Sequence, residues 1–390
     1  MPGFELIGKE EQNAVNDIFE RGGVLYRYGW HDQRQGIYRV DEFESNFAMK
    51  MGVKHALAVS SGTAALHLAL KALNIKPGDE VITQSHTFIA TVEAIVEVGA
   101  IPVITEVDKS LNMDPSDLAK KITSRTKAII PVHMMGAAAR MDEIMQIANT
   151  HDIPVLEDNA QCCGGTYHGK MLGTIGNVGI TSFDFGKVLT TGEGGMVYTN
   201  NEEIFKTVME YSDHGHELNP DLPRGEDTRH QSGFNYKMTE LQGAIGLVQL
   251  TKMDEIISQQ KKNKNLIKEG IRDIPEIEFR EIPNPDGDTG DSVVFFLENR
   301  EKAKQFAKLW TEKGYGTKNL PDAINWHFAG TWDHILPHYE HYSNKNVNEL
   351  FPHSNQILRR AIAIPIFVKM DEKNISDIIN AIHDCIGAIR

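Results

Sequence analysis

The feature that most constrains the fold is a regular alternation of strand-like and helix-like segments between residues 53 and 200. Apolar runs typical of strands occupy residues 55–60, 80–83, 102–105, 127–132 and 153–156. Helix-like patterns lie between them at residues 63–73, 87–98 and 141–150. This alternation predicts an α/β fold whose sheet is mainly parallel and carries helices on both faces. The ligands of such sheets bind at the carboxyl ends of the strands.

The pattern changes after about Gly233, and the chain is too long for one ordinary core. Helix-like patterns cover residues 235–262, 302–314 and 371–389, and a strand-like run covers residues 292–297. We therefore predict a large α/β domain of residues 1–254 and a smaller C-terminal α/β domain of residues 255–390. The helix predicted near residues 9–20 is expected to pack on the smaller domain.

Bulk composition argues against several classes of protein. With 41% hydrophobic and 24% charged residues, the chain is typical of soluble globular proteins. A net charge of −14 argues against a nucleic-acid binder, because phosphate backbones favour lysine and arginine. The start lacks the apolar core of an export signal, and the longest apolar stretch is too interrupted to cross a membrane. Cys162, Cys163 and Cys385 fit neither a disulfide framework nor a zinc site, so we expect a cytoplasmic protein.

One lysine has an unusual setting. Lys187 lies between a strand-like run and a glycine-rich turn, in the sequence SFDFGKVLTTGEGG of residues 182–195. Gly186 relieves steric limits just before it, and the glycines that follow let backbone approach closely. A lysine that forms a Schiff base must be held in place and have its pKa lowered by desolvation or neighbouring charge. A surface lysine beside a hairpin would fit the same pattern.

Three further motifs provide context, and each has a simpler explanation when it stands alone. SSGTAAL at residues 60–66 turns a strand into a helix, whose first N–H groups can bind a phosphate or simply be capped. EDNAQ at residues 157–161 puts a carboxylate at a strand end, where it can pair with a cationic ring nitrogen or lie in an acidic loop. SGFNYKMTELQ at residues 232–242 opens a long helix and can be another polar cap.

Taken together, in order and spacing, SSGTAAL, EDNAQ, SFDFGKVLTTGEGG and SGFNYKMTELQGAIGL resemble the DegT/DnrJ/StrS family of pyridoxal-5'-phosphate (PLP)-dependent sugar aminotransferases. The resemblance covers nearly the whole chain and is far more specific than any single motif. It implies the fold-type I architecture, PLP as the cofactor and a homodimer. It also implies that L-glutamate gives its amino group to a keto- or aldehydo-sugar for cell-surface polysaccharide or lipopolysaccharide synthesis.

The resemblance implies roles for the matched residues. Lys187 would form the Schiff base with PLP and move protons, and Asp158 would pair with the pyridinium nitrogen. Asn235 would reach the phosphate from the neighbouring subunit. The other implied cofactor contacts are Gly62, Thr63, Ala64 and Ser182 at the phosphate, Phe88 stacked on the ring, and Gln161 beside the ring hydroxyl.

The substrate side is less constrained by the sequence. His214, Arg229 and His327 are candidate substrate contacts; Arg229 suits a carboxylate but also fits a solvated charge cluster. No further ligands follow His214 and His216, so no metal is expected. The family resemblance leaves two kinds of acceptor open, nucleotide-linked keto-sugars and the free sugar acid 8-oxo-3,8-dideoxy-octulosonate. Met135 replaces the aromatic residue that the family often has there, which leaves details of the pocket open.

Two other functions remain open. Some sugar 3-dehydratases resemble the family but have histidine at the position of Lys187, so this lysine favours transamination over dehydration. A PLP-binding regulator without turnover would carry the same cofactor motifs. Conversion of the cofactor to its amine form by glutamate would distinguish an aminotransferase from such a regulator.

Overall fold

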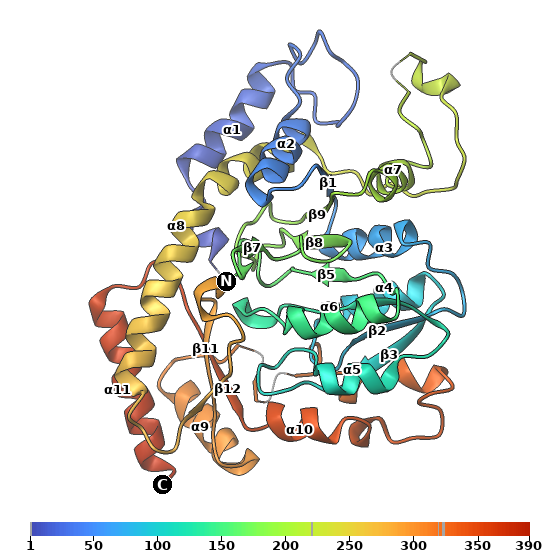
Figure 1. The fold of residues 1–390 in the computed structure, drawn as a ribbon. Helices are drawn as coiled ribbons and strands as arrows, with labels where there is room; N and C mark the ends of the chain where they lie inside the picture. The colour runs from blue at the N-terminus through green and yellow to red at the C-terminus, as the bar shows by residue number, and fades with distance from the viewer. Residues whose placement is uncertain (1, 220, 319, 322–323) are drawn as a thin grey trace.

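The structure, a computed structural model, describes residues 2–219, 221–318, 320–321 and 324–390. The strands at its centre are β1 (His55–Val59), β2 (Glu80–Gln84), β3 (Ile101–Thr105), β4 (Thr126–Ile130), β5 (Leu156–Asp158), β8 (Val178–Ser182) and β9 (Gly195–Thr199). They form two groups of order β3-β2-β4 and β1-β9-β8-β5, which isolated parallel bridges join between β4 and β5 (Figure 1). Within the described chain, β9 alone runs antiparallel to its neighbours in this sheet, so the mainly parallel sheet is confirmed.

Helices cover both faces of this sheet. Successive side chains of a strand point to opposite faces, and the apolar side chains on each face are buried against helices. They are α2 (Arg39–Met51), α3 (Gly62–Ala72), α4 (Ala90–Glu97), α5 (Pro115–Lys121), α6 (Met141–Thr150), α7 (Glu202–Tyr211) and α8 (Glu240–Ile271). Leu57 and Val59 of β1 pack in one core with α3, α4 and α7. Ala56 and Ala58 face the other way and pack with α2 and α8. Helices α5 and α6 cover this second face over β2, β3 and β4.

The C-terminal part is built on a small antiparallel sheet of order β10-β11-β12. Its elements are β10 (Glu278–Phe279), β11 (Ser292–Phe296), α9 (Arg300–Glu312), α10 (Pro352–Leu358), β12 (Ala361–Pro365) and α11 (Glu372–Ala388). Helices α9 and α11 pack on one face together with the end of α8, and residues 324–358 pack on the other. The predicted smaller C-terminal α/β part is therefore present (Figure 1).

Helix α8 connects the two parts of the molecule. It runs through residue 254 without a break, so the domain boundary between residues 254 and 255 stays a prediction. Helix α1 (Lys9–Glu20) packs along its first half, where Glu11 accepts hydrogen bonds from Gln249 at 2.8 Å and Lys252 at 2.7 Å. These contacts of α1 lie before residue 254, on the side of the large domain.

Two predicted boundaries shift for identifiable reasons. Strand β5 begins at Leu156 rather than at residue 153, because only Leu156–Asp158 pair with β8. The helix predicted from residue 235 begins only at Glu240, because Thr239 and Gln242 form a capping box there. No helix in the described part of the chain is long and apolar enough to span a membrane.

Candidate active site

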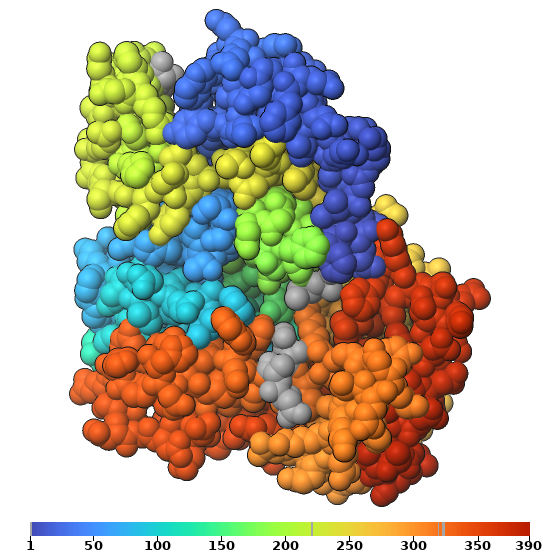
Figure 2. Space-filling view, turned by 180° about the vertical axis from the view of Figure 1, so that it is seen from behind, coloured from blue at the N-terminus to red at the C-terminus, as the bar shows by residue number. Residues whose placement is uncertain are grey.

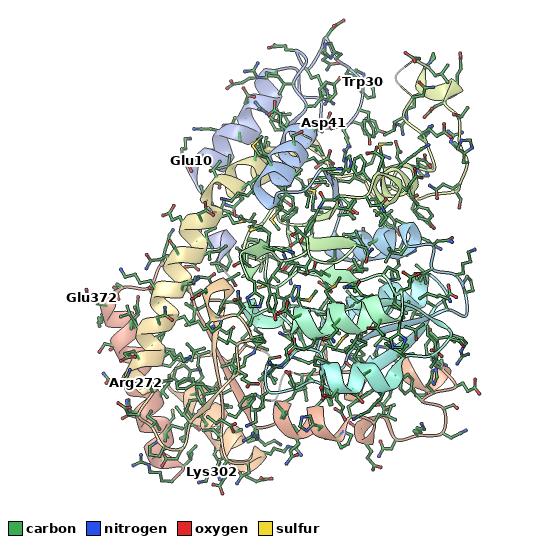
Figure 3. The ribbon with its side chains drawn as sticks, in the orientation of Figure 1. Glu10, Trp30, Asp41, Arg272, Lys302 and Glu372 are labelled. Atoms are coloured by element: carbon green, nitrogen blue, oxygen red, sulfur yellow. The ribbon has the colours of Figure 1, made fainter. Side chains whose placement is uncertain are left out.

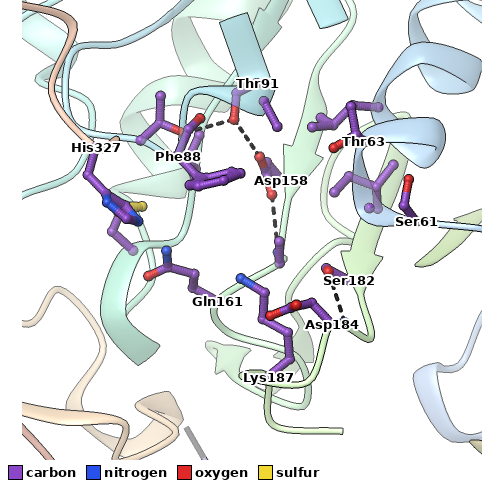
Figure 4. Close-up of a pocket in the computed structure, with 18 of the residues that line it drawn as sticks. Ser61, Thr63, Phe88, Thr91, Asp158, Gln161, Ser182, Asp184, Lys187 and His327 are labelled. Carbon is purple, nitrogen blue, oxygen red and sulfur yellow. Dashed lines mark hydrogen bonds between the residues drawn. The ribbon is translucent and has the colours of Figure 1, made fainter. Parts of the chain in front are cut away.

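A cavity of about 370 Å³ opens at the carboxyl ends of the parallel strands (Figure 4). The loops after β1, β2, β4, β5 and β8 form its walls, together with the segment around His327. This is where a ligand is expected on a parallel sheet. The sequence-predicted residues that line it are Gly62, Thr63, Phe88, Asp158, Gln161, Ser182, Lys187 and His327.

Lys187 enters this cavity from a tight turn that follows β8 (Figure 4). Asp184 holds the turn: its Oδ1 accepts a hydrogen bond from the Gly186 N–H, and its carbonyl accepts one from the Lys187 N–H, both at 3.0 Å. Burial lowers the pKa of Lys187, and the Asp184 carboxylate partly opposes this effect. The amine therefore loses its proton more readily than an exposed lysine does, as a nucleophile requires.

Asp158 lies across the cavity from Lys187, and protein groups already hold both of its oxygens. Thr91 Oγ1 donates to Oδ2 at 2.8 Å, and the Ala160 N–H donates to Oδ1 at 3.1 Å. Thr87 Oγ1 lies 2.8 Å from Thr91 Oγ1 behind them. Burial raises the pKa of Asp158, and the Thr91 hydroxyl opposes this rise. A buried carboxylate of this kind is stabilised by a cation, and a protonated ring nitrogen would supply one.

The start of α3 and the end of β8 meet at one side of the cavity. The first N–H groups of a helix have no partner within the helix, and those of Gly62 and Thr63 lie where the cavity begins. A Cβ on Gly62 would lie only 2.7 Å from the Cβ of Ser182, so glycine is required for this close approach. The predicted phosphate ligand Ala64 does not line the cavity, and its N–H already donates to Ser61 Oγ at 3.0 Å.

Gln161 is oriented by a neighbouring turn. Its Oε1 accepts a hydrogen bond from the Met135 N–H at 3.1 Å, and its carbonyl accepts one from the Gly136 N–H at 3.1 Å. With Oε1 engaged, the side-chain amide nitrogen is the group that can donate to a ligand. Met135 itself is fully buried in the core, whereas Met134 lines the cavity. The replacement of an aromatic by Met135 therefore changes the core beside the pocket rather than its wall.

Phe88 and His327 come from distant parts of the chain and meet at the cavity, with ring centroids 5.4 Å apart (Figure 4). The backbone explains why: the Thr87 N–H donates to the His327 carbonyl at 3.1 Å, and the Ile89 N–H to the Trp326 carbonyl at 2.9 Å. Burial lowers the pKa of His327 to about 3, and the charge of Lys187 acts in the same direction. The imidazole is therefore neutral at pH 7, and His327 lines the cavity beside Phe88.

His214, Arg229 and Asn235 do not line this cavity. They lie in an arm, residues 213–219 and 221–236, that projects from the end of α7 beside the N-terminal region (Figures 1 and 2). Within the arm, Arg229 Nη2 donates to His216 Nε2 at 2.9 Å. A single chain therefore leaves all three side chains outside its own pocket.

The sequence analysis missed two residues that line the cavity and hold predicted site residues in place. Thr91 and Asp184 line it and hold Asp158 and the Lys187 turn, respectively. Trp326 stacks on Phe88 with ring centroids 6.2 Å apart. Thr91 follows Thr87 by four residues, a spacing that puts side chains on the same side of a helix. This spacing is the only local indication in the sequence that the two hydroxyls meet.

Comparison with known proteins identifies the family. The model of the DegT/DnrJ/EryC1/StrS aminotransferase family matches residues 7–383. The chain belongs to this family. It is a PLP-dependent aminotransferase, so the sequence-based prediction of enzyme class and cofactor is confirmed. The donors at Gly62, Thr63 and Ser182 suit the phosphate, and Asp158 suits the ring nitrogen.

Individual relatives agree with this assignment over nearly their whole length. The spore coat polysaccharide biosynthesis protein SpsC of Bacillus subtilis is 33% identical, covering 98% of this chain and 95% of its own. GDP-perosamine synthase of Vibrio cholerae is 32% identical, covering 97% of each chain. Among solved structures, an aminotransferase from Psychrobacter cryohalolentis superimposes with a TM-score of 0.86 at 27% identity, covering 98% of each chain.

Proposed function

We propose that this aminotransferase moves the amino group of L-glutamate to a keto- or aldehydo-sugar used in cell-surface polysaccharide or lipopolysaccharide synthesis. The observation that carries the proposal is the placement of Lys187 and Asp158 on opposite sides of one cavity at the strand ends. The names of similar proteins, a spore coat polysaccharide protein and GDP-perosamine synthases, support a sugar as the acceptor. We further propose that it acts in the cytoplasm.

The residues of the cavity would have different roles in this reaction. Bound PLP would supply the electron sink that stabilises negative charge at the substrate carbon. Gly62, Thr63 and Ser182 would hold its phosphate, and Asp158 would keep the proton on its ring nitrogen. The Lys187 amine, with its lowered pKa, would take the proton from the α-carbon of glutamate and deliver one to the carbon that accepts the amino group.

The acceptor that we favour is the free sugar acid 8-oxo-3,8-dideoxy-octulosonate, whose product would be 8-amino-3,8-dideoxy-D-manno-octulosonate. Its carboxylate would give Arg229 a binding partner. No carboxylate of the described residues lies within ion-pair distance of Arg229, which instead donates to His216. His216 Nδ1 faces Asp227 Oδ2 at 3.3 Å, so His216 accepts from Arg229 while it is held by a carboxylate on its other side. An arginine without a paired acid suits an anionic ligand.

The reaction can be followed in two stages. L-glutamate should shift the visible absorbance of the PLP-loaded protein and appear as 2-oxoglutarate, and a suitable sugar should restore the spectrum. We expect 8-oxo-3,8-dideoxy-octulosonate to restore it in a panel that also contains nucleotide-linked keto-sugars. If only a nucleotide-linked sugar works, the favoured acceptor is wrong. A deoxy-keto product without nitrogen would identify a dehydratase, and no spectral change with any amino donor would favour a regulator.

A dimer would complete the site. Asn235, His214 and Arg229 lie in the projecting arm. Phe234 of the arm is 54% exposed, and Trp30 of the N-terminal region is 58% exposed (Trp30 is labelled in Figure 3). We propose that a second copy covers these two apolar side chains and brings its Asn235 to the phosphate of the first.

Mixed dimers test this arrangement directly. Asn235→Ala and Lys187→Ala should each abolish most of the activity as homodimers. A heterodimer of the two, isolated through different affinity tags, has one site with both native residues if Asn235 crosses the interface. We expect about half the activity of the native dimer, since one of two sites is intact. A heterodimer as inactive as its parents would mean that Asn235 serves its own subunit.

A further inference from the structure

The beginning of the chain contacts the turn that carries Lys187. The Gly3 N–H donates a hydrogen bond to the Lys187 carbonyl at 3.0 Å. The ring of Phe4 stacks on Phe185 of the same turn, with centroids 5.1 Å apart and planes inclined by 19°. Residues 2–6, which include the short helix η1 (Gly3–Leu6), thus form a strap across the outside of the turn. In Figure 2 the dark-blue start of the chain lies between green residues after β8 and red residues near the C-terminus.

The other end of the strap is anchored in a different part of the molecule. Both Glu5 carboxylate oxygens accept backbone hydrogen bonds, from the Val368 and Lys369 N–H groups, at 3.0 Å each. These residues follow β12 in the C-terminal part. The Leu6 carbonyl accepts a hydrogen bond from Lys252 Nζ of α8 at 2.8 Å. The strap therefore ties the Lys187 turn to the segment after β12 and to helix α8.

Contact between strap and turn is too close for any side chain at residue 3. A Cβ on Gly3 would lie 2.9 Å from the Lys187 carbonyl oxygen and 2.7 Å from that of Val188. Both obstacles are backbone atoms, so relief requires the strap or the turn to move. Gly8, two residues after the strap and just before α1, has no atom within 4 Å of the corresponding position.

We propose that residues 2–6 are a positioning element for Lys187, holding its backbone so that the amine stays inside the cavity. The proposal rests on the proposed role of Lys187 in amino transfer. The hydrogen bonds of Asp184 hold the turn only from within, because Asp184 belongs to the turn itself. The strap bonds the Lys187 carbonyl from outside the turn and fixes where the turn sits. Displacing a reacting group by about 1 Å can cost on the order of a hundredfold in rate.

Gly3→Ala tests the strap, and Gly8→Ala is its matched control, because the same methyl group there meets open space. In the cofactor-free protein, the pH dependence of Lys187 labelling by acetic anhydride can be measured by mass spectrometry. Burial lowers the pKa of Lys187, so a displaced, better solvated amine should be labelled with a midpoint at higher pH in Gly3→Ala. In the loaded enzyme, the glutamate half-reaction should slow about tenfold or more at saturating glutamate. Gly8→Ala should match the native protein in both measurements.

A Gly3→Ala protein with native labelling and a native half-reaction would overturn the proposal, and so would equal effects of both alanines. If Gly3→Ala does not fold, Phe4→Ala replaces it, and substitution of the exposed Phe19 by alanine is its control. Unchanged labelling of Lys187 in a folded Phe4→Ala protein would contradict the proposed role of the strap. The labelling experiment needs neither cofactor nor substrate. A native protein that fails to react with any amino donor would thus refute the proposed function and leave the labelling result to decide on the strap.

Discussion

Lys187→Ala should reduce amino transfer by about 10⁴-fold or more, because the group that attacks the cofactor and moves the proton is lost. Borohydride treatment of the PLP-loaded native protein should fix the cofactor to Lys187, as a mass increase on its peptide, and the variant should show no such increase. PLP itself should still bind, since the proposed phosphate contacts at Gly62, Thr63 and Ser182 are unchanged.

Lys170→Ala provides the control and should leave turnover unchanged. Lys170 is exposed and lies in the hairpin formed by β6 (Thr166–Tyr167) and β7 (Lys170–Met171). Substantial turnover by Lys187→Ala, with the cofactor fixed elsewhere, would show that another residue performs the chemistry. Fixation of the cofactor to Lys187 without amino transfer would instead support one of the other PLP functions.

Asp158→Asn should lower the rate of amino transfer by roughly 10²–10⁴-fold, because a neutral amide cannot keep the proton on the ring nitrogen. Without cofactor, the Asp158→Asn protein should be more stable to unfolding than the native protein at neutral pH. Burial raises the pKa of Asp158, so the ionised carboxylate costs free energy in the folded state, about 1.4 kcal/mol for each unit of pKa increase. Asparagine has nearly the same shape and carries no charge.

The pH dependence of this difference follows from the direction of the shift. Above the folded-state pKa the native carboxylate is charged, and the stabilising effect of Asp158→Asn should be at its largest. As the pH falls below about 3.9, the ordinary pKa of aspartate, the carboxyl group is neutral in both states and the difference should disappear. Melting temperatures of the two cofactor-free proteins between pH 3 and pH 8 measure it. A variant with native activity, or one less stable at every pH, would contradict this assignment.

Substitutions at Thr91 test the role of Asp158 without changing the carboxylate itself. Thr91→Val removes the hydroxyl that donates to Asp158 Oδ2, so the pKa of Asp158 should rise further and activity should fall, by less than in Asp158→Asn. Thr91→Ser keeps the hydroxyl and should stay close to the native enzyme.

Local patterns predicted much of the large domain. Helix α6 matches its predicted residues because its apolar positions repeat at helical spacing and face the core. The strand that ends at Asp158 was expected because short apolar runs alternate with helices, and a strand-like run was expected before Lys187. Helices α2 and α7 were missed. Their apolar residues are spread among charged ones, and these helices are stabilised mainly by packing against the rest of the protein.

The cavity was predictable only in part, because several of its contacts join distant segments. Phe88 and His327 meet through backbone hydrogen bonds between residues 87–89 and 326–327, and no local periodicity indicates such a pairing. The short motifs identified Lys187 and Asp158 because their chemistry needs particular residue types beside glycines and strand ends. Asn235, His214 and Arg229 remain predictions, since one chain does not bring them to its own cavity.

The anchoring of Glu5 also has a consequence for how the protein is made. Its partners Val368 and Lys369 follow it by 363 and 364 positions in the chain. At a synthesis rate of about 5–20 residues per second, Glu5 leaves the ribosome roughly 20–70 seconds before these partners are made. The strap residues are thus made long before the last of their partners, and the strap cannot be anchored at Glu5 until residues 368 and 369 have been synthesised.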